Sequence, residues 1–160
     1  MSRKLWVGLA ALLIAVTVAR AEKLWLDEMD KGLEQAKADS KYMLVDFSGS
    51  DWCGWCQKLD AEVFSKKEFK EYAASNLVCV IIDFPKRKPQ GKKERERNMA
   101  LKDKYGVSGF PTVLVMSPQG EEVGRTGYQP GGPERFIQDV QAFIDQHKKA
   151  TEQKAGAEQK

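Results

Sequence analysis

The sequence predicts an α/β fold in which a central β-sheet carries helices on both faces. Residues 77–84 form a run of apolar and β-branched side chains, which is typical of a strand buried on both faces of a sheet. Strand-like and helical patterns alternate from residue 24 to residue 147. A length of 160 residues fits one domain of this kind rather than several.

The composition is that of an ordinary globular protein with balanced charge. Hydrophobic residues make up 42% of the chain and charged residues 31%, so the chain can bury a core. The net charge of +3 comes from Arg3, Lys4 and Arg20, and the remaining residues include 23 basic and 23 acidic side chains. This balance excludes a globally basic nucleic-acid-binding protein, and we expect no nucleic-acid partner.

The first 21 residues have the three parts of an export signal. Residues 2–4 carry positive charge, residues 5–18 are almost entirely apolar, and residues 19–21 give the small-x-small pattern of a cleavage site. The alternative is an uncleaved membrane anchor, but the apolar run of 14 residues is shorter than the about 18 residues of a spanning helix. We therefore expect a signal peptide cleaved after Ala21 and a periplasmic or secreted protein.

Residues 22–84 predict helices and strands in alternation. Met29, Leu33 and Ala36 recur at helical spacing, and Ser65 with Glu68 has the form of a capping box that would begin a further helix. The expected elements are an extended piece at 24–26, a helix at 27–38, a strand at 42–47, a helix at 53–64, a helix from 65 to 76 and the strand at 77–84.

Residues 85–97 form a basic insertion, with seven basic and two acidic side chains and three loop-forming Pro or Gly residues. Two interpretations stay open: a solvated charged surface, or a docking patch for an acidic partner or a membrane. The expected elements after it are a helix at 94–105 closed by Gly106, an antiparallel hairpin at 112–116 and 121–126, a helix at 133–147 and a flexible tail at 148–160.

Cys53 and Cys56 form a CxxC pair between a predicted strand and a predicted helix. The unpaired N–H groups at a helix N-terminus stabilise a thiolate, so Cys53 is expected to be the nucleophile and Cys56 the resolving cysteine. A zinc site is disfavoured because only Cys79 and His147 could add ligands, and neither has ligand spacing. The remaining alternative is a static structural disulfide.

Four sequence features together resemble the thioredoxin superfamily, and most of all its exported bacterial members related to periplasmic thiol:disulfide interchange domains. They are Leu44-Val45-Asp46-Phe47, Trp52-Cys53-Gly54-Trp55-Cys56, Gly109-Phe110-Pro111-Thr112, and a hairpin containing Gly120 before an amphipathic helix. The resemblance implies a thioredoxin-like fold, with a mixed central sheet, and a dithiol/disulfide active site. The expected thioredoxin-like domain spans residues 22–147.

The resemblance also implies roles for residues around the cysteines. Pro111 matches the family's cis-proline, and Phe110 before it would offer its backbone to an extended substrate. Trp52 and Trp55 flank the cysteines and would bind substrate; packing alone is the alternative for Trp55. Asp46 matches a buried carboxylate that helps deprotonate the resolving cysteine, although thioredoxins have one residue fewer in the segment that follows it. The alternative for Asp46 is a structural bond to the next loop.

Cys79 stands where thioredoxins have a lysine that pairs with the buried aspartate. We interpret Cys79 as a small buried hydrophobic side chain, because it lies within a strand-like run. The absence of the lysine predicts a raised pKa for Asp46, since no opposite charge would keep it ionised.

The sequence therefore predicts an exported thiol–disulfide oxidoreductase that acts on protein thiols and disulfides. The spacer between the cysteines contains no histidine, and Asp46 and Asp51 would raise the pKa of a thiolate, so a reductant or electron relay is favoured over a primary oxidant. A membrane-borne electron donor, a monomeric state and no cofactor are expected. The alternatives are a binding module with a locked disulfide, and soft-metal handling, which lacks a third ligand.

Overall fold

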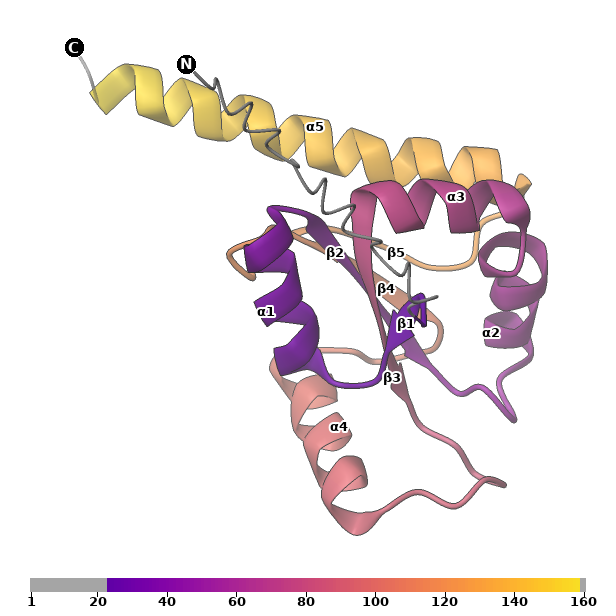
Figure 1. Cartoon of the computed structure of the whole chain (residues 1–160). Coiled ribbons are helices and arrows are strands. Elements are labelled where there is room, and N and C mark those ends of the chain that lie inside the picture. Colours follow the sequence, from indigo (N-terminus) through magenta and orange to yellow (C-terminus); the bar gives the residue numbers. More distant parts are fainter. Residues whose placement is uncertain (1–22, 159–160) are drawn as a thin grey trace, which may run out of the picture.

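A mixed five-stranded sheet forms the centre of the computed structural model, which describes residues 23–158 (Figure 1). The strand order is β1-β3-β2-β4-β5; β1, β3 and β2 run parallel, and β4 is antiparallel to both β2 and β5. The expected signal peptide lies outside the described residues. The strands are β1 (Trp25–Leu26), β2 (Tyr42–Ser48), β3 (Leu77–Asp83), β4 (Thr112–Met116) and β5 (Glu122–Thr126).

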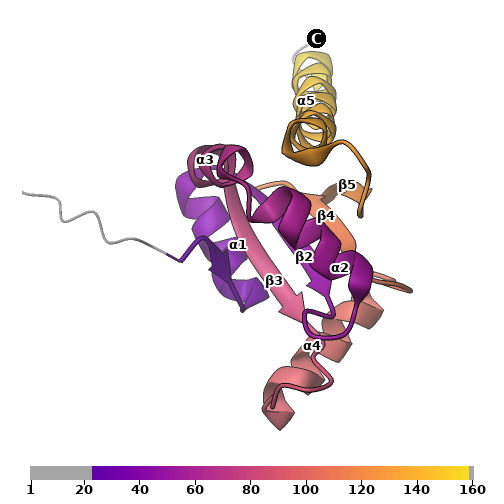
Figure 2. The same ribbon diagram turned by 90° about the vertical axis from the view of Figure 1, so that its right-hand side faces the viewer.

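Helices cover both faces of this sheet, as the sequence predicts. They are α1 (Met29–Asp39), α2 (Gly54–Leu59), the π-helical segment η1 (Asp60–Phe64), α3 (Lys67–Asn76), α4 (Lys92–Lys104) and α5 (Gly132–Glu158). Side chains of α2, η1, α3 and α5 fill the core on one face, and those of α1 and α4 fill it on the other. Figure 2 shows α5 and α4 on opposite sides of the sheet. Within the described residues, no helix is both long and apolar enough to cross a membrane.

The apolar patterns of β2 and β3 explain why these strands are central. All seven residues of β2 are buried, and β3 is buried along most of its length. Alternate side chains point to opposite faces, so Leu44 and Cys79 enter one core while Val45 and Val80 enter the other. The two strands thereby fix the position of the loop that follows β2 and carries the cysteines.

Two local expectations are wrong. Ser65 does not cap α3, which begins at Lys67 without a side-chain cap. Instead, the N–H group of Ser65 donates to the backbone carbonyl of Asp60, and the Ser65 hydroxyl donates to the Asp60 carboxylate. Ser65 therefore closes the turn that precedes α3. The last helix does not end at His147 but continues to Glu158, beyond the sheet (Figure 1). The change in composition after residue 147 marks the end of the apolar stripe and not the end of the helix. The helix continues because Ala, Glu, Gln and Lys are themselves good helix formers.

Candidate active site

Cys53 and Cys56 are joined by a disulfide at the start of α2, with their Cα atoms 5.3 Å apart. Cys53 is the N-cap residue of this helix, and its sulfur accepts the backbone N–H of Cys56 at 3.2 Å. The predicted position of Cys53 at a helix N-terminus is therefore confirmed. Once the disulfide is reduced, this N–H and the helix dipole would stabilise negative charge on the Cys53 sulfur.

Cys56 faces the interior of the domain. Its sulfur accepts the backbone N–H of Gly49 at 3.5 Å, and its side chain lines a pocket between α2 and the sheet. Both cysteines are buried, with 7% of Cys53 and 4% of Cys56 exposed, so accessibility alone does not rank them. Their surroundings differ: Cys53 lies at the helix N-terminus, whereas Cys56 lines a pocket that also contains a buried acid.

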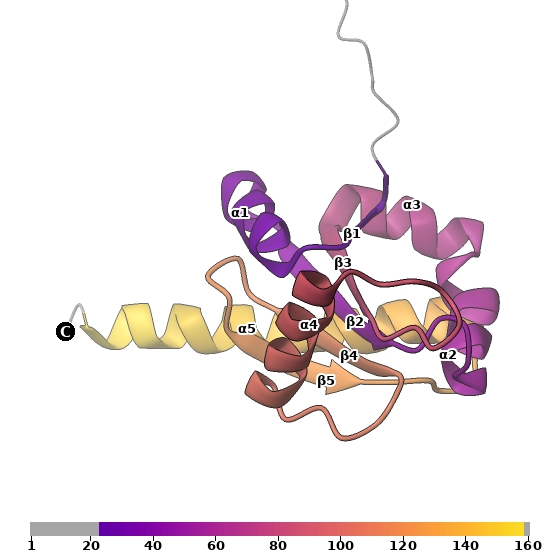
Figure 3. The ribbon, with the colours of Figure 1, turned by 90° about the horizontal axis from the view of Figure 1, so that it is seen from below.

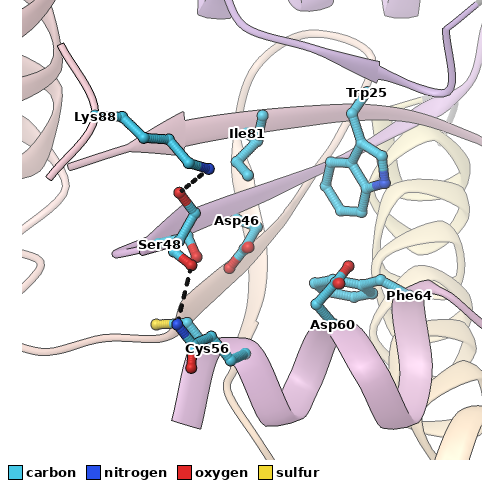
Figure 4. A pocket seen from close by; sticks show the side chains of 10 residues that line it. Trp25, Asp46, Ser48, Cys56, Asp60, Phe64, Ile81 and Lys88 are labelled. Atoms are coloured by element: carbon cyan, nitrogen blue, oxygen red, sulfur yellow. Dashed lines mark hydrogen bonds between the residues drawn. The ribbon is translucent and has the colours of Figure 1, made fainter. Parts of the chain in front are cut away.

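That acid is Asp46, whose side chain points into a pocket of about 380 Å³ that Cys56, Asp60 and Trp25 also line (Figure 4). Asp46 is 4% exposed, and its Oδ1 atom has no hydrogen-bond partner. A buried carboxylate oxygen without a donor is costly when it is charged. The pocket that Cys56 lines therefore holds a group that can take up a proton.

Burial, and after it the negative charges of Asp83 and Asp60, raises the pKa of Asp46 to about 7. Across the sheet Asp46 pairs with Ile81, an apolar residue. Cys79 pairs with Leu44 instead, and burial raises the pKa of its thiol to about 12. The predicted rise in the Asp46 pKa is confirmed, and Cys79 is a buried hydrophobic side chain, as expected.

Trp52 connects the cysteine loop to the proline loop. The peptide bond between Phe110 and Pro111 is cis, as the resemblance implied. The ring of Trp52 lies edge-on to that of Phe110 at 5.9 Å, and its Nε1 donates to the carbonyl of Phe84 at 2.7 Å. Gly49 permits this arrangement, because a Cβ atom at that position would collide with the Trp52 ring. The structure thus brings Trp52, Phe110 and Pro111 to one side of the cysteine pair.

Trp55 lies between the two cysteines in the chain and is 60% exposed. Its ring packs against Tyr128 at 5.3 Å, and the Lys58 ammonium group lies over both rings. Tyr128 in turn donates a hydrogen bond to Glu62 at 2.7 Å. Tyr128 is not among the site residues that the sequence predicts, because it lies 73 positions after Trp55 in an irregular segment and no local pattern links the two. The exposed Trp55 ring, backed by the half-buried Tyr128, offers an apolar contact for a protein substrate beside the disulfide.

Asp51 fastens the basic insertion to the cysteine loop. Its carboxylate accepts the backbone N–H groups of Lys86, Arg87 and Lys88 at 2.9, 2.8 and 2.8 Å. The bond from Lys86 contributes most to lowering the pKa of Asp51, and the other two add to it. Figure 3 shows the segment between β3 and α4 passing beside the start of α2. The sequence alone indicates Asp51 only as a negative charge near Cys53, because its partners lie 35 to 37 positions away.

Ser50 adds a second connection between these two segments. Its N–H and hydroxyl donate to the Asp83 carboxylate at 2.9 and 2.6 Å, and Lys88 Nζ approaches its hydroxyl at 3.4 Å. The backbone N–H of Phe84 donates to the carbonyl of Ser48 at 2.8 Å. The first residues of the insertion are therefore part of the active-site border, while residues 92–97 belong to α4.

No group of three or more metal-ligating side chains lies together anywhere in residues 23–158. The cysteine pair itself provides two sulfurs that can pass between dithiol and disulfide. With a buried acid in the pocket that Cys56 lines, and with tryptophans next to Cys53 and Cys56 in the chain, the arrangement is suited to thiol–disulfide exchange.

Comparisons with known proteins agree with this chemistry. Residues 29–144 match a family model described as a thioredoxin-like domain. The disulfide bond reductase DsbH of Chlamydia pneumoniae is 34% identical over 127 residues, which cover 79% of this chain and 76% of the relative. The thioredoxin-related protein DsbJ of the same organism is 31% identical over 128 residues, covering 74% of this chain but only 37% of DsbJ.

Solved structures give the same result. A structure of the DsbH oxidoreductase matches with a TM-score of 0.73 and 30% identity, covering 91% of this chain and 95% of the other. A thioredoxin from Thermus thermophilus matches with a TM-score of 0.57 and 20% identity over 75% of this chain and 85% of its own, and shares the fold.

Proposed function

This chain belongs to the thioredoxin superfamily and is a thiol–disulfide oxidoreductase, and from that premise we propose that it works outside the cytoplasm as a reductant of protein disulfides. The observation that carries the proposal is the setting of Cys53. The helix N-terminus is the main group that stabilises its thiolate, and the spacer of Gly54 and Trp55 contains no imidazole.

The reaction proceeds in two exchanges. The Cys53 thiolate attacks one sulfur of a client disulfide, which forms a mixed disulfide and releases the other client sulfur as a thiolate. Cys56 then loses its proton and attacks the Cys53 sulfur, which forms the Cys53–Cys56 disulfide and releases the second client thiolate. The client gains two electrons and this chain loses two.

Asp46 accepts the Cys56 proton in the second exchange. A base for this step must lie near the sulfur and have a pKa near the working pH. Asp46 shares a pocket with Cys56 and has a pKa raised to about 7, so its carboxylate can take up the proton when the mixed disulfide resolves. Trp52 with Phe110 and Pro111, and the exposed Trp55, hold the client chain across Cys53.

The charges around Cys53 support reduction rather than oxidation. Strong oxidants of this fold stabilise their thiolate to an unusual degree, which gives potentials of about −120 mV, against about −270 mV for thioredoxin. Lys58 and Lys86 are the cations at the flanking tryptophan rings, and because they are exposed, water and salt screen their charge. A potential nearer the thioredoxin value follows.

A cysteine pair with such a low reduction potential needs a source of electrons in an oxidising compartment. The basic, apolar and small-residue segments of residues 1–21 support export with cleavage after Ala21. We infer that a membrane-borne dithiol donor reduces the Cys53–Cys56 disulfide again after each cycle, and that the chain acts as a monomer.

Equilibration of the purified protein with glutathione buffers tests the direction of electron flow. The fraction of reduced Cys53 and Cys56, read from thiol alkylation, gives the reduction potential. A value near −270 mV is expected. A value above about −150 mV would overturn the reductant assignment and favour an oxidase or isomerase.

A further inference from the structure

Three cations border the reactive disulfide on its Trp52 side, and we propose that they bind acidic side chains that flank the target cysteine of a protein client. Lys86, Arg87 and Lys88 form this cationic rim. The inference rests on the proposed function, because the client must place its own disulfide on Cys53. It adds a substrate class to that function, namely disulfides in acidic sequence.

The rim is fixed in place through its backbone. Asp51 binds the N–H groups of all three rim residues, and Trp52 Nε1 binds the carbonyl of Phe84 just before them. The three side chains are exposed and take no part in these backbone bonds. A segment held by its backbone presents its side chains to solvent in a defined position, which lowers the entropy lost when a partner binds.

The rim lies next to the route that a client must follow. Lys86 Nζ is 3.8 Å from the centre of the Trp52 ring, and Trp52 directly precedes Cys53 in the chain. The same ring contacts Phe110 beside the cis-proline. A client strand that crosses Cys53 and reaches the proline loop therefore passes within reach of the ammonium group of Lys86.

The charge of the rim is available to a partner. Among the described residues, no carboxylate forms an ion pair with Lys86, Arg87 or Lys88. Asp51 and Asp83 reduce the local positive charge, but their carboxylates are occupied by backbone N–H groups and by Ser50. Positive groups that form no ion pair, when they lie beside a reaction site, speed the approach of negatively charged substrates.

Two peptides provide the test: one with a disulfide flanked on both sides by glutamates, and the same peptide with glutamines. The second-order rate constant of reduction by the reduced protein is measured for each by stopped-flow tryptophan fluorescence. At about 20 mM salt the acidic peptide should react about tenfold faster, and at about 500 mM salt the ratio should fall below about two.

Three variants assign this ratio to the rim. Replacing all three residues by glutamine should bring the ratio to about one, whereas Lys86→Arg, Arg87→Lys and Lys88→Arg together should retain it. Lys148→Gln, Lys149→Gln and Lys154→Gln remove the same charge at the far end of α5 and should also retain it (Figure 1).

Equal rates for the two peptides with the wild-type protein would overturn the inference while leaving the proposed function intact. Equal loss of the ratio in the rim and α5 variants would also overturn it, because net charge alone would then explain the effect. Binding to phosphatidylserine vesicles that depends on the rim, without a preference for the acidic peptide, would make the rim a membrane contact instead. No reduction of either peptide would overturn the proposed function and this inference together.

Discussion

Replacing Asp46 by asparagine should stabilise the protein by an amount that grows with pH. Asparagine keeps the shape of the side chain and removes its charge, so the variant lacks the cost of burying a carboxylate. The pKa of Asp46 is raised to about 7 in the fold, against about 3.9 in an unfolded chain, and this difference corresponds to about 4 kcal/mol.

The sign follows from where the proton is bound. Below about pH 4 the acid is protonated in both states and costs the fold nothing; between about pH 4 and pH 7 only the unfolded chain ionises, so the wild-type protein loses stability as the pH rises. Urea unfolding of the oxidised protein, followed by tryptophan fluorescence, measures this loss. The gain from Asp46→Asn should be near zero at about pH 4 and should reach about 4 kcal/mol at about pH 8.

Asp103→Asn is the matched control, because Asp103 is an exposed aspartate on α4 and its replacement should change stability little at any pH. The difference in the free energy of unfolding between wild type and variant does not contain the titration of other groups, because these groups behave alike in both proteins. A gain from Asp46→Asn that does not change between about pH 4 and pH 8 would refute the argument that burial holds this acid protonated.

Three further outcomes test the site. Cys56→Ser should accumulate mixed disulfides with client proteins on non-reducing gels and Cys53→Ser should not; equal trapping by both would contradict the assignment of the nucleophile. Asp46→Ala should slow resolution of the mixed disulfide by about tenfold or more while leaving its formation nearly unchanged, as single-turnover kinetics would show; unchanged resolution would remove Asp46 from the mechanism. In the reduced folded protein Cys79, whose thiol has a pKa raised to about 12, should resist alkylation that it accepts in urea; rapid labelling without denaturant would show that the strand opens.

The parts of the fold that the sequence predicted well are those whose signal is local. Residues 77–84 are predicted as a buried strand because the run is short, apolar and rich in β-branched residues, and β3 ends within one residue of the predicted end. The CxxC pair falls at a helix start because the chain there leaves a buried strand. The cis bond before Pro111 was implied by family resemblance and not by any local pattern.

The parts that escaped prediction depend on contacts between distant residues. In the sequence Asp51 is an isolated charge, and only the structure shows that it binds the backbone of Lys86. Tyr128 is likewise an ordinary loop residue in the sequence, and only the structure shows its contact with the Trp55 ring. Ser65 is a local exception: it matches a capping box, yet its hydroxyl bonds to Asp60, five positions earlier. Here two local arrangements compete for the same hydroxyl, and the sequence pattern does not choose between them.

Because Asp51 binds the basic insertion through its backbone, the position of that segment does not depend on which side chains it carries. A carboxylate that binds backbone N–H groups makes the same bonds whether the residues carry lysine, glutamate or serine, so residues 86–88 can be exchanged for others without releasing the segment. Proline is the exception, because it has no N–H to donate. The preference for particular client proteins could thus be changed by replacing residues 86–88 with other tripeptides. Asp51 would be kept, and the cysteine pair would not be altered.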